Sequence, residues 1–193
     1  MNIKILNISE VENDYEQIKT LYEESFPRTE RFPFDYIVKR SQKEDMKFDI
    51  FYDNNNFIGL SYMIMEKNIV FILYFAVNNK HRGKGYGTEI LKQLKEKYKD
   101  YTILLEIEEL REDSSNYDQR VRRKSFYEKN GFYGTNKHIK EGPNVFEIMT
   151  SDINTSFDNK LFRKIYKKMF NGIGKLIVPV FIKMKKGLEW KKQ

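Results

Sequence analysis

The sequence contains no cysteine and only two histidines, His81 and His138, among its 193 residues. The absence of cysteine excludes disulfide bonds, thiolate nucleophiles and cysteine-based zinc sites. The two histidines are 57 positions apart, so carboxylates would have to supply most ligands of a zinc site. We therefore expect no metal centre.

Long hydrophobic runs are also missing. The most apolar stretch near the C-terminus, residues 176–182, has seven residues including Pro179, whereas about 20 are needed to span a bilayer. Residues 1–8 alternate in polarity and lack the apolar core and cleavage site of a secretory signal. These absences predict a cytoplasmic protein without a transmembrane helix.

The net charge of +7 is not spread along the chain. Residues 151–193 carry +8 and residues 1–150 carry −1, so the larger part lacks the basic excess of a nucleic-acid-binding face. With 40% hydrophobic and 15% aromatic residues, that part can bury a substantial core. We expect one domain at residues 1–150, a basic helical extension at 151–193, and no nucleic-acid partner.

Alternating polarity predicts strands at residues 3–8, 48–52, 57–65, 69–77, 102–107 and 145–149. Hairpin turns are expected at Asp53-Asn54-Asn55-Asn56, because Asn and Asp tolerate left-handed backbone, and at Glu66-Lys67-Asn68. Hairpin strands followed by helix, strand, helix and strand predict an α/β (α+β) fold. Its sheet would be mixed and mostly antiparallel, with six to seven strands flanked by helices.

The spacing of apolar residues predicts helices at residues 15–26 and from about Asp35. A third helix is predicted after a glycine-rich loop, and its apolar stripe contains Ile90, Leu91, Leu94 and Tyr98. The C-terminal part has a similar stripe with Lys and Arg between its members: Leu161, Phe162, Ile165, Tyr166, Met169 and Phe170. We expect this basic amphipathic helix to pack on the core or on a second subunit in a homodimer. Peripheral contact with an anionic membrane, or with nucleic acid, is the less favoured alternative.

The glycine-rich loop, Arg-Gly-Lys-Gly-Tyr-Gly-Thr at residues 82–88, lies between an apolar strand and an amphipathic helix. Free amides at a helix start and the helix dipole favour an anion such as a diphosphate, and glycines let the backbone approach it. Arg82 and Lys84 add positive charge. A simple tight turn is the alternative. The Gly-x-Gly-x-Gly spacing argues against a dinucleotide fold, and a Walker A loop is excluded because no Gly-Lys-Ser/Thr triplet occurs.

These residues resemble the cofactor loop of the GNAT superfamily of acetyltransferases, whose pattern Arg/Gln-x-x-Gly-x-Gly/Ala is filled by Arg82, Gly85 and Gly87. The resemblance covers residues 3–149. It implies acetyl-CoA as cofactor, with backbone groups around Phe75 and Val77 bonding the pantetheine arm and loop amides holding the diphosphate. The implied cofactor-binding residues are Phe75, Ala76, Val77, Arg82, Gly83, Lys84, Gly85, Tyr86, Gly87, Thr88 and Asn116.

Residues 122–132 resemble the second GNAT signature, a helix that ends in Tyr-x-x-x-Gly-Phe. The resemblance places Tyr127 beside the cofactor sulfur, where a phenol of pKa about 10 can protonate a departing thiolate of pKa about 8.5. Packing of a helix-end aromatic is the alternative. Many GNAT relatives carry Asn seven residues before this tyrosine, where this chain has Arg120. Asn116, eleven residues before the tyrosine, is therefore the residue to which we assign the cofactor contact of that Asn.

An attacking amine must lose a proton, so the reaction needs a base. Alternation puts Leu104, Glu106 and Glu108 on one face of their strand. Glu106 is the candidate general base and Glu108 the reserve. The alternative is that both carboxylates merely solvate the strand.

Residues 106–118 hold six acidic side chains and one Arg, which predicts a small cationic acceptor, polyamine-like or an aminosugar; a solvated loop is the alternative. Residues 26–34 resemble the inter-helix loop that borders the acceptor pocket in some bacterial GNAT proteins. The GNAT resemblance implies an N-acetyltransferase that moves an acetyl group from acetyl-CoA to a primary amine, with Tyr127 as general acid. A non-catalytic acyl-CoA-binding regulatory module is the alternative.

Overall fold

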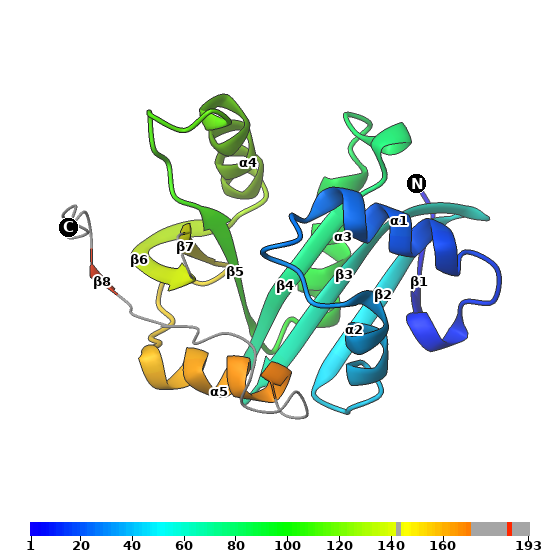
Figure 1. Cartoon of the computed structure of the whole chain (residues 1–193), viewed down its shortest axis with the longest axis horizontal. Coiled ribbons are helices and arrows are strands. Elements are labelled where there is room, and N and C mark those ends of the chain that lie inside the picture. Colours follow the sequence, from blue (N-terminus) through cyan, green and yellow to red (C-terminus); the bar gives the residue numbers. More distant parts are fainter. Residues whose placement is uncertain (142–143, 171–184, 187–193) are drawn as a thin grey trace. The chain divides into compact units, whose positions relative to one another are not determined.

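The computed structural model describes residues 1–141, 144–170 and 185–186 (Figure 1). The apolar run at residues 176–182 lies outside the described residues. The chain forms two compact units: residues 1–65 with 72–99, and residues 66–71 with the chain from residue 100 onward. No helix in the described part is both long and apolar enough to cross a bilayer.

Four strands follow one another at the start of the sheet: β1 (Ile3–Asn7), β2 (Met46–Asp53), β3 (Asn56–Glu66) and β4 (Ile69–Val77). β2 pairs antiparallel with both β1 and β3. Asn54 has a φ of 54° in the β2–β3 turn, and Lys67 has a φ of 55° between β3 and β4. Both predicted hairpin turns are confirmed.

Helices cover both faces of the sheet in the first unit. Phe48 of β2 packs against Phe34, with ring centroids 5.9 Å apart, whereas the carboxylate of the next residue, Asp49, lies 2.7 Å from Lys97 Nζ. Since successive strand residues point to opposite faces, the helices that hold Phe34 and Lys97 lie on opposite sides. The helices of this unit are α1 (Tyr15–Ser25), α2 (Phe34–Arg40) and α3 (Tyr86–Lys97).

In the second unit, β7 (Asn144–Thr150) pairs antiparallel with both β5 (Thr102–Glu108) and β6 (Tyr133–Glu141). β6 is absent from the strands predicted by alternation. Its residues are mostly polar, a register shift lies between Gly134 and His138, and few of its side chains are buried. Pairing with β7 therefore determines this strand more than its own pattern does. The remaining elements are α4 (Tyr117–Lys129), α5 (Asn159–Phe170) and β8 (Lys185–Lys186).

The apolar stripe of α5 packs into the core of the second unit. Phe162, Ile165, Tyr166 and Met169 are buried, and the Phe162 ring lies 5.6 Å from that of Phe71. On the polar side, Lys168 Nζ lies 2.8 Å from a carboxylate oxygen of Glu66. The predicted amphipathic helix is confirmed, and its apolar face covers the unit to which it belongs.

We expect Phe162→Ala to lower the free energy of unfolding of the full chain by about 3–5 kcal/mol, because it opens a cavity at a fully buried site. Urea unfolding followed by circular dichroism measures this. The matched control is Arg163→Ala, an exposed neighbour on the same helix, which should change stability by less than about 0.5 kcal/mol. Equal effects of the two substitutions would contradict the packing of α5.

Candidate active site

The glycine-rich loop forms an uncapped helix start. β4 ends at Val77, a 3-10 turn covers Asn79–His81, and α3 begins at Tyr86. Gly83 and Gly85 have φ values of 73° and 83°, which side chains with a Cβ rarely adopt. Gly85 is the N-cap, and no side chain caps this end of α3 in the described part of the chain. The amides of the first turn are therefore left for an external acceptor.

The base of the loop is fixed by side chains of its own unit. The Tyr86 hydroxyl donates to Asp53 Oδ2 at 2.8 Å, and the Asn2 amide donates to Asp53 Oδ1 at 3.0 Å. These donors, the Asn2 amide first, hold the pKa of Asp53 below its usual value. Arg82 Nε donates to the Val77 carbonyl at 3.1 Å. The loop is thus tied to the β2–β3 turn and to the end of β4.

The same loop suits a diphosphate by its charge and its open space. A Cβ added at Gly83 would meet no described atom within 4 Å, so the backbone can approach a ligand closely there. Lys84 is exposed, and with Arg82 it adds positive charge to a helix N-terminus that already favours anions. The nearby Asp53 carboxylate has a donor on each oxygen, which partly offsets its charge.

Residues Phe75, Ala76 and Val77 form the end of β4 beside this loop. The Ala76 carbonyl points toward β3, where a Cβ at Gly59 would lie 2.4 Å from its oxygen. Glycine is therefore required at residue 59 for the two strands to approach. The Val77 carbonyl accepts from Arg82, so one backbone group of the predicted pantetheine strand already has a partner within the chain.

The loop at residues 26–34 is held to β4 by Tyr74. The Tyr74 hydroxyl donates to the Glu30 carbonyl at 3.1 Å and accepts from the Phe32 amide at 3.2 Å. The Tyr74 ring also lies 5.0 Å from Tyr22 and 4.7 Å from Phe26. Residues 26–34, which resemble the loop that borders the acceptor pocket, are thereby fixed to β4, the strand that the resemblance assigns to the cofactor.

Tyr127 lies in the second unit, near the end of α4. It exposes 8% of its surface, and its ring packs edge-on against Phe126 and Phe132 at 5.2 and 5.9 Å. Burial raises the pKa of Tyr127 to about 12, although the charge of Arg123 lowers it somewhat. After the helix, Gly131 takes a φ of 71° and the Phe132 amide donates to the Tyr127 carbonyl at 3.0 Å. The predicted left-handed closure of this helix at Gly131 is confirmed.

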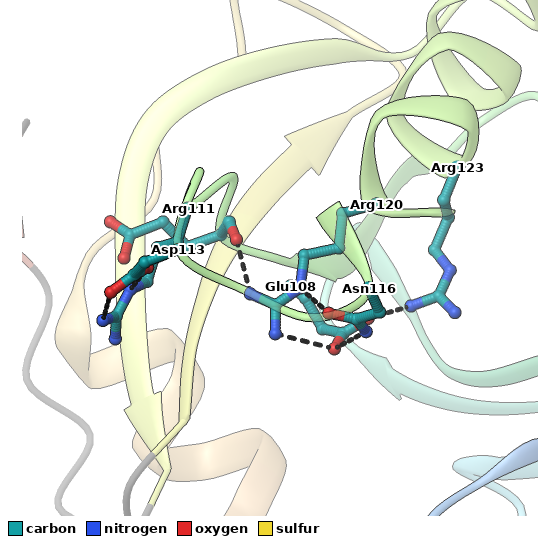
Figure 2. Close-up of polar contacts among 7 residues, drawn as sticks. Glu108, Arg111, Asp113, Asn116, Arg120 and Arg123 are labelled. Atoms are coloured by element: carbon teal, nitrogen blue, oxygen red, sulfur yellow. Dashed lines mark hydrogen bonds and ion pairs between the residues drawn. The ribbon is translucent and has the colours of Figure 1, made fainter. Parts of the chain in front are cut away.

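A polar network centred on Glu108 joins the end of β5 to α4 (Figure 2). Arg123 Nη1 lies 2.6 Å from one carboxylate oxygen, and Arg120 Nη2 lies 3.2 Å from the other. Asn116 Nδ2 also donates to Glu108 at 3.1 Å, while Asn116 Oδ1 accepts from Arg120 Nε at 2.8 Å. Both ends of the Asn116 amide therefore have partners within the protein. Arg120, which stands where many relatives carry Asn, organises this network.

The network bears on two of the sequence predictions. Glu108, the reserve base, is paired with two guanidinium groups within the protein. Asn116 would have to exchange partners to contact a cofactor.

Other members of the acidic run at residues 106–118 also have partners: Asp113 is paired with Arg111 at 2.8 Å and Glu109 lies 3.7 Å from His138. In the described part, no group of three or more His, Asp or Glu residues could hold a metal ion.

Glu106, the candidate base, lies near two residues that the sequence did not assign to a site. The Tyr166 hydroxyl of α5 lies 3.2 and 3.4 Å from the two Glu106 oxygens and also contacts a carboxylate oxygen of Glu141 on β6. Tyr166 appeared in the sequence only as a member of an apolar stripe. Glu141 lay in a strand that alternation did not reveal, so no sequence signal linked the three.

Tyr86→Phe should speed amide hydrogen exchange at residues 83–88 by about threefold to tenfold, because it removes the hydrogen bond that fixes the loop to Asp53, worth roughly 0.5–1.5 kcal/mol. Hydrogen–deuterium exchange with mass spectrometry measures this on the full chain. Tyr101→Phe, at a half-exposed tyrosine, is the control and should leave the loop unchanged. Identical exchange in the two variants would argue against the anchoring role.

Part of the chain is similar to a known domain family. Residues 45–133 match the family model described as an acetyltransferase (GNAT) domain. The Bacillus subtilis (strain 168) protein YjbC, named as an acetyltransferase, is 26% identical over 130 residues, which cover 65% of this chain and 63% of that protein. The chain thus aligns with less than two thirds of this relative's length.

Solved structures show the same fold. A GNAT-family protein from Bacteroides thetaiotaomicron superposes with a TM-score of 0.65 at 24% identity, covering 90% of this chain and 98% of that one. An aminoglycoside 6'-N-acetyltransferase, solved in complex with coenzyme A, superposes with a TM-score of 0.61 at 15% identity, covering 82% and 100%. The chain therefore has the fold of GNAT acetyltransferases, a mixed and mostly antiparallel sheet flanked by helices, and its residues 45–133 are similar to the acetyltransferase (GNAT) domain.

Proposed function

We propose that the protein transfers an acetyl group from acetyl-CoA to a primary amine by direct attack of the amine on the thioester. The observation that carries this proposal is the uncapped start of α3, where left-handed Gly83 and Gly85 precede free amides beside Arg82 and Lys84. A helix start of this kind favours a diphosphate. The match of residues 45–133 to an acetyltransferase domain supports the same assignment.

In this proposal the amides of residues 83–88 hold the diphosphate of acetyl-CoA, and backbone groups around Phe75 and Val77 bond the pantetheine arm. Arg82 and Lys84 add charge without needing a fixed geometry. Coenzyme A is present in the aminoglycoside acetyltransferase complex whose fold this chain shares. Because backbone groups do most of the binding, the side chains at the end of β4 are free to vary.

Tyr127 is the proposed general acid. As the amine nitrogen bonds to the carbonyl carbon, the bond from carbon to sulfur breaks and the phenol hydrogen-bonds to the thiolate that leaves. With a pKa of about 12, Tyr127 is protonated throughout the neutral range. Complete transfer to a thiolate of pKa about 8.5 would be uphill by roughly 5 kcal/mol in the ligand-free protein. Tyr127 therefore stabilises the developing thiolate as a hydrogen-bond donor, and the departed thiolate takes its proton from solvent.

Glu106 is the proposed base that accepts the proton of the attacking amine. Of the two candidates, Glu108 faces Arg120 and Arg123, whereas the described contacts of Glu106 include the neutral hydroxyl of Tyr166. Glu108 would have to leave both guanidinium groups to meet an amine. This difference supports the choice of Glu106.

The acceptor is proposed to be a small amine, and a cationic one is favoured by the acidic run after β5. Part of that charge is compensated internally, because Glu108 and Asp113 pair with arginines. Glu112 and Asp118 are exposed and supply the remaining negative charge. The attraction for a polycation is therefore weaker than the sequence count of acidic residues implies.

Tyr127→Phe should lower kcat for CoA release about tenfold to a hundredfold, the range expected for loss of a positioned acid. The decrease should be equal at pH 7 and pH 9, since both lie well below the pKa of about 12. CoA release is measured with a thiol reagent against a panel of neutral, monocationic and polycationic amines. A decrease that disappears at pH 9 would contradict the role of Tyr127. If the wild type binds acetyl-CoA but acetylates no amine in the panel, the protein is a binding module instead.

Gly85→Ala should weaken CoA binding about tenfold, because alanine is strained by roughly 1–2 kcal/mol at a φ of 83° and the loop amides would lose their alignment. Isothermal titration measures the Kd for CoA and for pantetheine, which lacks the diphosphate. We expect the loss for CoA alone. An equal loss for both ligands would mean that the loop does not hold the diphosphate.

A further inference from the structure

Arg123 and Tyr127 lie on the same face of α4. They are four residues apart in this helix, a spacing that makes their side chains neighbours on the helix surface. Arg120, three residues before Arg123, continues the same stripe. The helix face that ends in the proposed general acid thus carries two guanidinium groups, and Arg123 is the nearer of them along the helix.

A carboxylate on the neighbouring strand fixes the position of Arg123. Arg123 Nη1 lies 2.6 Å from Glu108 Oε2, at the end of β5 (Figure 2). The side chain of Glu108 is 19% exposed and that of Arg123 is 42% exposed. An arginine at so exposed a place would otherwise sample many rotamers. The ion pair therefore limits the motion of the guanidinium group and keeps it beside β5.

Glu108 does not fully cancel the charge of Arg123. The same carboxylate also pairs with Arg120, whose Nη2 lies 3.2 Å from Oε1, and it accepts a hydrogen bond from Asn116 at 3.1 Å. Asn116 is neutral, so two guanidinium groups and one carboxylate leave this network with one positive charge. The negative charge of Glu108 is divided between two arginines, and a positive excess remains next to α4.

The phenol of Tyr127 responds to this charge. Burial raises the pKa of Tyr127 to about 12, and the charge of Arg123 acts in the opposite direction. The described rings that pack on Tyr127, those of Phe126 and Phe132, are apolar. Lys124, the next residue on α4, lies 2.7 Å from a carboxylate oxygen of Glu147. A nearby positive charge makes a phenol more acidic and therefore a stronger hydrogen-bond donor.

We propose that Arg123, held by Glu108, is a positioning residue that strengthens Tyr127 as a hydrogen-bond donor to the thiolate leaving group. The proposal rests on the proposed function, in which Tyr127 meets the sulfur of CoA. As the bond from carbon to sulfur breaks, its electron pair stays on sulfur, and the phenol donates a hydrogen bond to that atom. The phenol and the guanidinium group keep their protons, and the departed thiolate takes its proton from solvent.

Two substitutions at residue 123 separate charge from packing, because Lys and Met both have long unbranched side chains. In the full chain, Arg123→Met should lower kcat for CoA release about threefold to tenfold, whereas Arg123→Lys should lower it by no more than about twofold. Arg122→Met removes the same charge from an exposed neighbour on α4 and should match the wild type. Equal kcat values in Arg123→Met and Arg123→Lys would overturn the proposal.

A Tyr127→Phe background tests whether Arg123 acts through the phenol. The donor is absent there, so adding Arg123→Met should lower kcat by less than about twofold further. A further decrease as large as in the wild type would mean that the charge acts elsewhere, which would overturn the proposal. If Tyr127→Phe is slow but the two variants at residue 123 are alike, Tyr127 remains the acid and only the role of Arg123 is lost.

The thiol of bound CoA gives a readout that does not depend on turnover. Its pKa, followed in labelled CoA by the ¹³C resonance of the carbon next to sulfur, should be about half a pH unit higher in Arg123→Met than in Arg123→Lys. Equal values would overturn the proposal. If the wild type binds CoA but acetylates no amine, the transfer function fails and this titration alone decides the role of Arg123. A chain that binds no CoA would contradict both.

Discussion

The attraction between an anion and the unpaired amides at the start of α3 is the interaction on which this account depends. Gly83 and Gly85 adopt left-handed backbone, and the helix begins without a side-chain cap. An uncapped helix start carries partial positive charge and donors without acceptors. Other elements of the first unit position these amides. β4 leads the chain into the loop, and the Tyr86 hydroxyl bonds the loop to Asp53. The left-handed positions are both glycines, so the loop adopts this conformation without steric strain.

The proposed acid and base operate in surroundings unlike those of the loop. Tyr127 is enclosed by aromatic rings, and burial keeps its phenol protonated. Glu106 shares a buried hydroxyl with Glu141, while Glu108 is neutralised by arginines. One strand thus holds two carboxylates with different partners.

Local features were predictable from the sequence, whereas long-range polar pairing was not. The stripe of Ile90, Leu91 and Leu94 repeats at helical spacing and is buried as expected, and the hairpin turn at Asn54 follows from residue preference. β6 was not predicted, because its polar residues form a strand only through pairing with β7. The partners of Glu108 and Glu106 lie 8 to 60 positions away, beyond the reach of any local pattern.

A structure of the protein with coenzyme A, at a resolution that places the phosphate oxygens, tests the central claim most directly. We expect diphosphate oxygens to accept hydrogen bonds from backbone amides of residues 83–88 at about 2.7–3.2 Å. A diphosphate bound elsewhere, with those amides facing solvent or another protein group, would contradict it.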